Sequence, residues 1–178
     1  MKNPRLPLIQ HMKAMQSEGI GCQACTGVCC TMARNSMRIN AAETEDIVRW
    51  IKAQTEEEQA TWLEKMKTCV DDYQLDRPTP GDGRRSLVRR SYTCPFFSPG
   101  PKGCALPRET KPLGCLAFNA TIPDAANDDR CQSDQSLLSH VIAKHPDYLA
   151  RSDSLKTQLG LDWDSLPIPQ AIISFVNN

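Results

Sequence analysis

The chain has 178 residues, in which 21 lysines and arginines balance 21 aspartates and glutamates. This length suits one compact domain, and the zero net charge provides no long-range attraction to nucleic acid or to an anionic membrane. No stretch approaches the roughly 18 apolar residues of a membrane-spanning helix, and residues 1–15 contain no continuous apolar segment of a secretory signal. We therefore expect a cytoplasmic protein with reduced thiols and no membrane partner, and nucleic acid is disfavoured as a partner.

Residues 1–20 are predicted to form a helical N-terminal arm, because Leu8, Met12 and Met15 recur at helical spacing. The next segment, residues 21–31, is too rich in glycine, cysteine and threonine for a regular helix or strand. Glycine permits the backbone angles with which a chain wraps around an ion. We expect a turn-rich knuckle there.

Residues 40–72 are predicted to be helical, with two start signals. Asn40 is followed three residues later by Glu43, and Thr55 by Glu58. Both pairs have the spacing of a capping box, in which the two residues satisfy free backbone N–H groups at a helix start. Apolar residues recur at helical spacing after each pair: Ile47, Trp50 and Ile51, then Trp62, Leu63, Met66 and Val70. The pattern predicts two helices joined near Thr55, or one helix kinked there.

The middle of the chain is predicted to be irregular. Residues 73–83 form a Pro/Gly-containing loop, and residues 84–92 are a candidate short strand. Residues 93–131 combine many prolines and glycines with four cysteines. Such a stretch does not build a conventional core, and a bound metal would supply the missing folding free energy.

After Cys131 the pattern predicts one more helix, capped by Ser133 and ending at Pro146, with an apolar face. The face consists of Leu137, Leu138, Val141 and Ile142. Residues 147–178 are expected to form a tail that packs on the domain and adds one or two helical turns. The chain then divides into an arm (1–20), a cysteine-cluster domain (21–146) and this tail. We expect a small, single-domain, mainly α cysteine-cluster fold with irregular, metal-stabilised loops.

Nine cysteines are the most informative feature of the composition, and eight of them fall into two groups. The first group is Cys22, Cys25, Cys29 and Cys30. The second group is Cys94, Cys104, Cys115 and Cys131, separated by 9, 10 and 15 residues. The ninth, Cys69, follows Met66 in a predicted helix and is interpreted as a buried or half-buried thiol.

The spacing of the first group indicates metal binding, because a Cys-x2-Cys pair places two sulfur atoms on one ion. With four cysteines in each group, the chain has eight candidate ligands, enough for two complete tetrahedral sets. Histidine is missing near both groups. An all-thiolate set suits zinc or iron–sulfur clusters and disfavours magnesium and calcium. The proline after Cys94 is a feature of some iron–sulfur loops.

Two questions stay open at the level of the sequence. Cys29 and Cys30 are adjacent, and neighbouring side chains tend to point apart. Either the two serve different metals, or one is a ligand and the other packs or takes part in redox chemistry. Disulfide bonds would require an oxidising compartment, and a redox-switching set of thiols is a further alternative.

The combined pattern resembles the YkgJ-type cysteine-cluster family, described as a zinc- or iron-chelating domain. The resemblance rests on Cys-x2-Cys-x3-Cys-Cys at 22–30, Cys-Pro-Phe-Phe at 94–97, Gly-Cys at 103–104 and Lys-Pro-x-x-Cys at 111–115, with Phe118 following. It extends from Cys22 to Cys131 and implies eight metal-chelating cysteines. A relative with methylating activity is thought to use an iron–sulfur cluster. This chain has Lys111 and Leu116 where the family commonly has arginine. These departures leave the sulfur ligands in place.

The sequence leaves the role of the centre undecided between an enzyme, a binding module and a metal carrier. No phosphate loop, nucleotide-binding glycine motif or Ser/His/Asp set accompanies the cysteines. A basic strip with Tyr92 interleaved could contact an anionic partner, although a solvated strand explains it more simply. The strip contains Arg84, Arg85, Arg89 and Arg90.

We expect a protein that holds an iron–sulfur cluster, such as 4Fe–4S, or zinc through two converging cysteine groups. Its role would be redox or accessory, with or without a protein partner. The alternative is a zinc-stabilised structural or binding module without catalysis.

Overall fold

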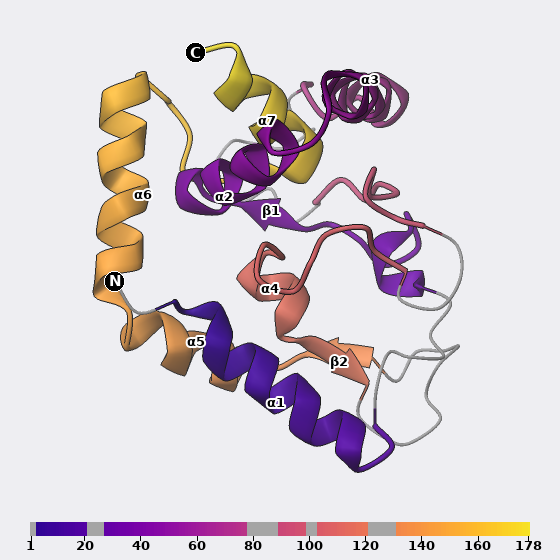
Figure 1. The fold of residues 1–178 in the computed structure, drawn as a ribbon, viewed down its shortest axis with the longest axis vertical. Coiled ribbons are helices and arrows are strands. Elements are labelled where there is room, and N and C mark those ends of the chain that lie inside the picture. The colour runs from indigo at the N-terminus through magenta and orange to yellow at the C-terminus, as the bar shows by residue number, and fades with distance from the viewer. Residues whose placement is uncertain (1–2, 21–26, 78–88, 99–102, 121–130) are drawn as a thin grey trace.

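A computed structural model describes residues 3–20, 27–77, 89–98, 103–120 and 131–178. These residues form one mainly helical domain with two small sheets (Figure 1). The elements in chain order are α1 (Arg5–Ser17), a 3-10 helix (Val28–Cys30), β1 (Arg38–Ile39), α2 (Ala41–Lys52), α3 (Glu56–Tyr73), α4 (Leu113–Leu116), β2 (Phe118–Ala120), β3 (Cys131–Ser133), α5 (Gln135–Ala143), α6 (Pro146–Leu159), β4 (Leu166–Pro167) and α7 (Ile168–Val176).

Both predicted capping boxes are confirmed, and they divide residues 40–72 into two helices. The Asn40 side chain accepts a hydrogen bond from the Glu43 backbone N–H at 2.9 Å, and the Glu43 carboxylate accepts one from the Asn40 backbone N–H at 3.1 Å. Thr55 and Glu58 make the same reciprocal pair at the start of α3. The Thr55–Glu58 capping box supplies hydrogen-bond partners for the first N–H groups of α3, so α3 begins there as a new helix. α2 and α3 are therefore separate helices rather than one kinked helix.

Two antiparallel strand pairs connect distant parts of the chain. β1 pairs with β4, with Arg38 opposite Pro167, and β2 pairs with β3, with Ala120 opposite Cys131. Since β4 leads directly into α7, the first pair brings the C-terminal helix against α2 and α3. Figure 1 shows these three helices together in one half of the molecule, with α6 running along the side from α5.

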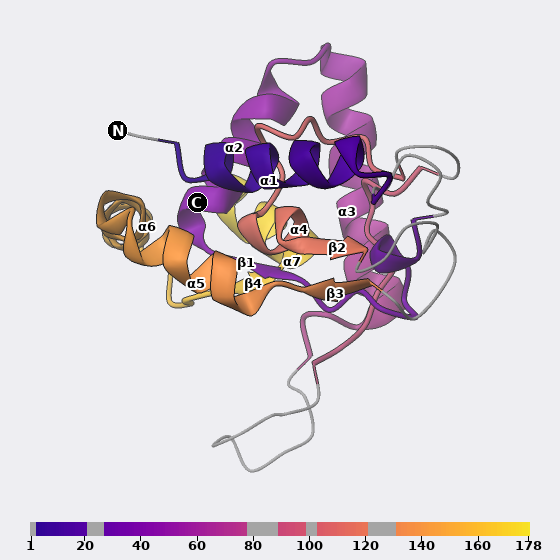
Figure 2. The same ribbon diagram turned by 90° about the horizontal axis from the view of Figure 1, so that it is seen from below.

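The core consists of two apolar clusters, one in each half. The larger cluster packs α2, α3 and α7 around Tyr92, Cys94 and Phe96. The smaller cluster lies under α1, where Leu8, Ile9 and Met12 contact residues of α4, α5 and α6. Figure 2 shows α4 beneath α1. Cys94 thus belongs to the larger cluster, against which Cys30 and Cys104 also pack, whereas α4, which carries Cys115, belongs to the smaller one.

Two local predictions were wrong, the cap of the helix after Cys131 and the extent of helix in the tail. The helix is capped by Asp134, whose side chain accepts a hydrogen bond from the Leu137 backbone N–H at 2.8 Å, while Ser133 ends β3. The helix does end before Pro146, at Ala143, and Pro146 itself begins α6, because proline fits the first turn of a helix, where its missing N–H costs nothing. The segment 147–178 holds most of α6 and all of α7, far more helix than expected.

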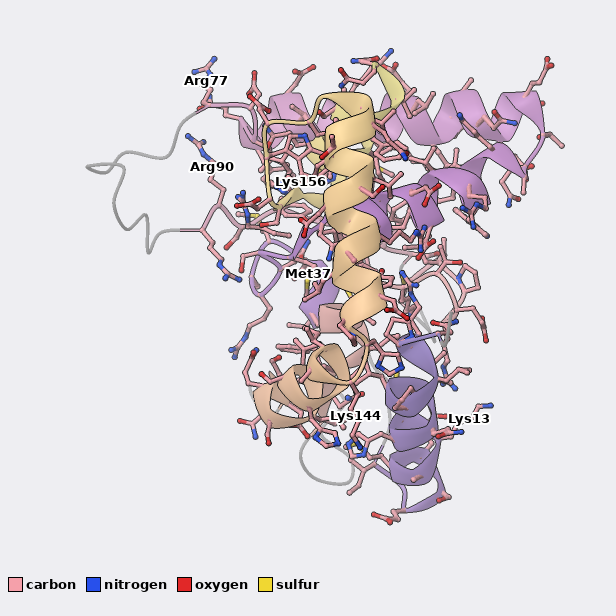
Figure 3. The ribbon with its side chains drawn as sticks, turned by 90° about the vertical axis from the view of Figure 1, so that its left-hand side faces the viewer. Lys13, Met37, Arg77, Arg90, Lys144 and Lys156 are labelled. Carbon is pink, nitrogen blue, oxygen red and sulfur yellow. The ribbon has the colours of Figure 1, made fainter. Side chains whose placement is uncertain are left out.

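The predicted strand 84–92 lies partly outside the described residues, and its described part, 89–92, is irregular. Tyr92 is fully buried, so its ring does not belong to an exposed basic strip. Its hydroxyl donates to the Met37 carbonyl at 2.6 Å and accepts from the Ile168 backbone N–H at 3.0 Å. Arg90 is half-buried, and its Nη1 donates to the Tyr73 carbonyl at 3.4 Å, on the side of the molecule that also carries Arg77 (Figure 3). The two hydrogen bonds of the Tyr92 hydroxyl therefore hold the segment that precedes Cys94 in the core.

Within the described ranges, no helix combines the length and the apolar character needed to cross a membrane.

Candidate metal centre

Five cysteines line one cavity of about 110 Å³. Two come from the first sequence group and three from the second: Cys29, Cys30, Cys94, Cys104 and Cys115. Cys22 and Cys25 lie outside the described residues. Cys131 is described in β3 but does not line this cavity. The fold thus brings five of the eight predicted site residues to one place.

A backbone contact between two glycines brings Cys29 and Cys30 to this cavity. Gly27 has φ 79° and precedes the 3-10 turn that carries both cysteines. A Cβ on Gly27 would lie 2.4 Å from Cε2 of Phe97 and 3.3 Å from the Cα of Gly103. A side chain at Gly27 would therefore push this turn away from the segment around Cys104.

The two cysteine groups are also joined by a direct backbone hydrogen bond. The Cys94 N–H donates to the Cys30 carbonyl at 2.7 Å. Cys94 then begins a turn in which its own carbonyl accepts from the Phe97 N–H at 2.8 Å. A bridge between Phe97 and Cys104 places Cys104 on the returning arm. Cysteines far apart in the chain are thus held by backbone contacts.

Aromatic packing fixes the Cys94 turn against α2 and α3. Phe96 is fully buried, and its ring centroid lies 6.0 Å from that of Trp50 and 5.1 Å from that of Trp62. Such offset and edge contacts stabilise a cluster beyond the area that it buries. The Cys-Pro-Phe-Phe motif therefore supplies one cavity cysteine and the apolar anchor that locates it.

Cys115 reaches the cavity from the opposite half, on the four-residue helix α4. The Leu113 backbone N–H donates to Oε1 of Glu43 at 2.8 Å. The carbonyl of Lys111, two residues before Leu113, accepts from Nε of Arg5 at 2.7 Å. Arg5 is only 3% exposed and also bonds Asp46 at 2.7 Å. Buried polar groups of α1 and α2 therefore hold the segment that carries Cys115.

The cavity thiols are close enough to affect each other's ionisation. Burial raises the pKa of Cys94 and of Cys115 above the ordinary thiol value, and neighbouring cysteines raise both further. The pKa of Cys29 is raised chiefly by its thiol contact with Cys30, whose Sγ lies 4.0 Å away, and then by burial. These causes favour protonated thiols until a cation enters, since a metal ion deprotonates the thiols that it binds.

The donor set of the cavity fits a thiophilic metal. Among the described residues lining it there is no carboxylate or histidine, and the remaining wall is largely apolar. Thiolate donors of this kind suit zinc, iron–sulfur clusters and other soft centres. Two cationic residues, Arg34 and Lys111, also line the cavity. The positive charge of Lys111 acts to lower the pKa of Cys29 and of Cys115, and would offset charge on thiolate ligands.

The described side chains do not yet form a closed coordination shell. Within the parts of the chain that the structure describes, no group of three or more His, Cys, Asp or Glu residues has the geometry of a metal site. The described cysteines therefore surround a cavity, and ligation would require their sulfur atoms to turn toward a common centre.

Cys69 is separate from this cavity, and its prediction as a buried thiol is confirmed. It is 6% exposed and its Sγ donates to the Thr93 carbonyl at 3.4 Å. Burial, followed by the nearby Asp72, raises its pKa to about 12. Because Cys69 is buried but does not line the cavity, it is a suitable control for the cavity cysteines.

Several residues that shape the cavity were not singled out from the sequence. Glu43 was identified only as a capping acid, and its contact with Leu113 has no local sequence signal. Gly103 was noted beside Cys104, but the motif does not reveal that Gly27 packs against it. The contact between Arg5 and Lys111 spans 106 positions and is likewise invisible to local pattern analysis.

Replacing Gly27 by alanine is expected to destabilise the fold more than the same change at Gly19. The two glycines have nearly equal φ angles, 79° and 77°, but no atom lies within 4 Å of a Cβ at Gly19. Gly19→Ala should cost the left-handed backbone penalty of about 1–2 kcal/mol. Gly27→Ala should cost about 1–3 kcal/mol more, because it also crowds Phe97 and Gly103. Urea unfolding of both variants measures the difference, and equal losses would contradict the close approach.

Comparison of the chain with protein-family models, with curated proteins and with solved structures gives no match.

Proposed function

We propose that this protein binds a metal centre through cysteine thiolates from both sequence groups. One observation carries the proposal: Cys29 and Cys30 line the same cavity as Cys94, Cys104 and Cys115. These cysteines come from segments about 60 to 90 positions apart in the chain, and ligands of one centre must converge in this way. Cys22, Cys25 and Cys131 complete the proposed ligand set.

An iron–sulfur cluster is the preferred form of this centre, with zinc as the alternative. The proline after Cys94 and the wide spacing of the second group favour a cluster, as does the resemblance to the YkgJ-type family. Such a cluster would supply electron transfer or an open coordination position. The chain's own residues would bind it, exclude water through the apolar wall and offset its charge with Lys111.

A structural role for the centre is supported by a separate feature of the fold. The segments around Cys94, Cys104 and Cys115 contain little regular structure, yet they connect the two apolar clusters. A metal at their meeting point would stabilise the contact between the halves. A zinc-stabilised module without catalysis is therefore the second candidate.

Cobalt(II) titration of reduced, metal-free protein tests thiolate ligation without presuming the natural metal. We expect intense sulfur-to-cobalt charge-transfer absorption that saturates at a fixed ratio and disappears when zinc displaces cobalt. Titration of the unfolded chain in urea serves as the control for binding by free thiols. A spectrum typical of water or carboxylate ligands would contradict the proposal.

A further inference from the structure

Glu43 is a buried carboxylate that contacts the starts of two different helices. Its Oε2 accepts from the Asn40 N–H at 3.1 Å, which completes the capping box of its own helix. Its Oε1 accepts from the Leu113 N–H at 2.8 Å, the first residue of α4. Glu43 is only 7% exposed. Capping its own helix uses one oxygen, so the second contact needs another explanation.

The equivalent residue of the next helix shows that the second contact is not part of capping. Glu58 occupies the same position in the capping box of α3, and the hydrogen bonds of its Oε2 go to Thr55. Glu58 is exposed and lies far along the chain from any cavity cysteine. The two acids share the capping role, but only Glu43 is buried and contacts α4.

The segment that receives this contact carries Cys115. α4 has only four residues, too short to be stable through its own hydrogen bonds, and its first N–H groups have no partners within the helix. A charged acceptor makes a stronger hydrogen bond than a neutral one. Arg5 holds the adjoining Lys111 carbonyl on the same side. The place of Cys115 therefore depends on acceptor and donor groups of α2 and α1.

We propose that Glu43 is a positioning residue for the metal centre, because it couples the start of α2 to the helix that presents Cys115. This inference rests on the proposed function of the cysteine cavity. Glu43 itself does not line the cavity and is not a ligand. It belongs to the class of outer groups that orient ligands, whose loss typically weakens metal affinity about 10–100-fold.

The negative charge of Glu43 and its hydrogen bond to Leu113 would have opposite effects on metal affinity. An ionised carboxylate near Cys115 opposes formation of the thiolate, so a group acting through charge alone would weaken metal binding. Removing it would then strengthen binding. Positioning predicts the reverse, and the sign of the change separates the two effects.

Three substitutions of Glu43 distinguish positioning through its hydrogen bonds from an effect of its charge. Glu43→Ala removes both acceptors, and we expect about a 10–100-fold loss of cobalt affinity. Glu43→Gln keeps one acceptor oxygen for Leu113 and should recover most of the affinity. Glu43→Asp keeps the charge and the cap but is too short to reach both partners, so its affinity should fall.

Two control variants remove general effects on stability. Glu58→Ala makes the same chemical change in the other capping box and should leave cobalt affinity unchanged. Ile51→Val removes one methylene from the buried face of α2, at a cost of about 0.5–1.5 kcal/mol, and should also bind like the wild type. Circular dichroism of each variant confirms that it is folded before the titration.

The outcomes separate this inference from the proposed function. If the wild type shows no cobalt–thiolate absorption, the proposed function itself fails. If the wild type binds cobalt and both Glu43→Ala and Glu43→Asp bind it equally well, metal binding stands and the positioning role is overturned. Tighter binding by Glu43→Ala and Glu43→Gln alike would assign Glu43 an effect of charge and also overturn the inference. Should Glu43→Ala not fold, the other two variants decide between the effects. Weaker cobalt binding by Glu43→Asp than by Glu43→Gln supports the positioning role, and equal binding overturns it.

Discussion

Replacement of Cys115 by serine is expected to remove most of the bound metal, whereas Cys69→Ser should retain the wild-type amount. Cys115 lines the cavity together with four other cysteines, and Cys69 does not line it. A lost ligand should cost more than the roughly 10–100-fold typical of an outer-shell change. Elemental analysis of both variants, purified side by side without oxygen, gives metal per chain.

Cys104→Ser and Cys30→Ser extend this comparison to both sequence groups. Each should lower the metal content as Cys115→Ser does, because the proposed centre draws on both groups. Cys69 is buried to a similar degree as Cys94, so the control also tests whether losing any buried thiol disturbs the fold. Because Cys29 also lines the cavity, full metal content both in Cys104→Ser and in the double variant Cys29→Ser/Cys30→Ser would show that the groups do not share a centre.

Removal of the metal should lower the free energy of unfolding substantially. A ligand present at about 1,000 times its dissociation constant stabilises the folded state by about 4 kcal/mol. For a chain of this size that corresponds to a fall of about 8–16 °C in the melting temperature. Thermal melts of the loaded protein, and of the same sample after anaerobic treatment with a chelator, measure the change.

Hydrogen exchange should locate this loss of stability. We expect faster exchange in residues 89–98 and 103–120, which surround the cavity, and nearly unchanged exchange in the paired helices α3 and α7, whose contact is apolar. Reloading the metal should restore protection. Equal melting temperatures with and without metal, at confirmed removal, would contradict a stabilising centre.

The helical half of the fold was predictable where its signals are local. Asn40 with Glu43 and Thr55 with Glu58 are short-range pairs, and both caps form as predicted. Predictions failed where two local signals competed. Ser133 and Asp134 are both good caps, and strand pairing of Ser133 with Phe118 leaves the role to Asp134. That pairing is long-range and has no counterpart in the local pattern.

The candidate site was predictable in its chemistry but not in its geometry. Cysteine type and spacing indicated thiolate ligands, and five of the eight residues do line one cavity. The contacts that bring them together are the Gly27–Gly103 approach, the Cys30–Cys94 hydrogen bond and the Glu43–Leu113 hydrogen bond. Each joins segments more than 60 positions apart, and such contacts depend on the completed fold rather than on neighbouring residues.

The most direct test of the central claim is the metal and sulfide content of the full chain, purified without oxygen and recorded together with its visible spectrum. We predict stoichiometric metal, with iron, acid-labile sulfide and a broad band near ~400 nm for the preferred iron–sulfur centre. Stoichiometric zinc in a colourless sample would select the alternative module. A folded protein that contains no metal and takes up neither iron with sulfide nor zinc would contradict the claim that the cysteine cavity is a metal centre.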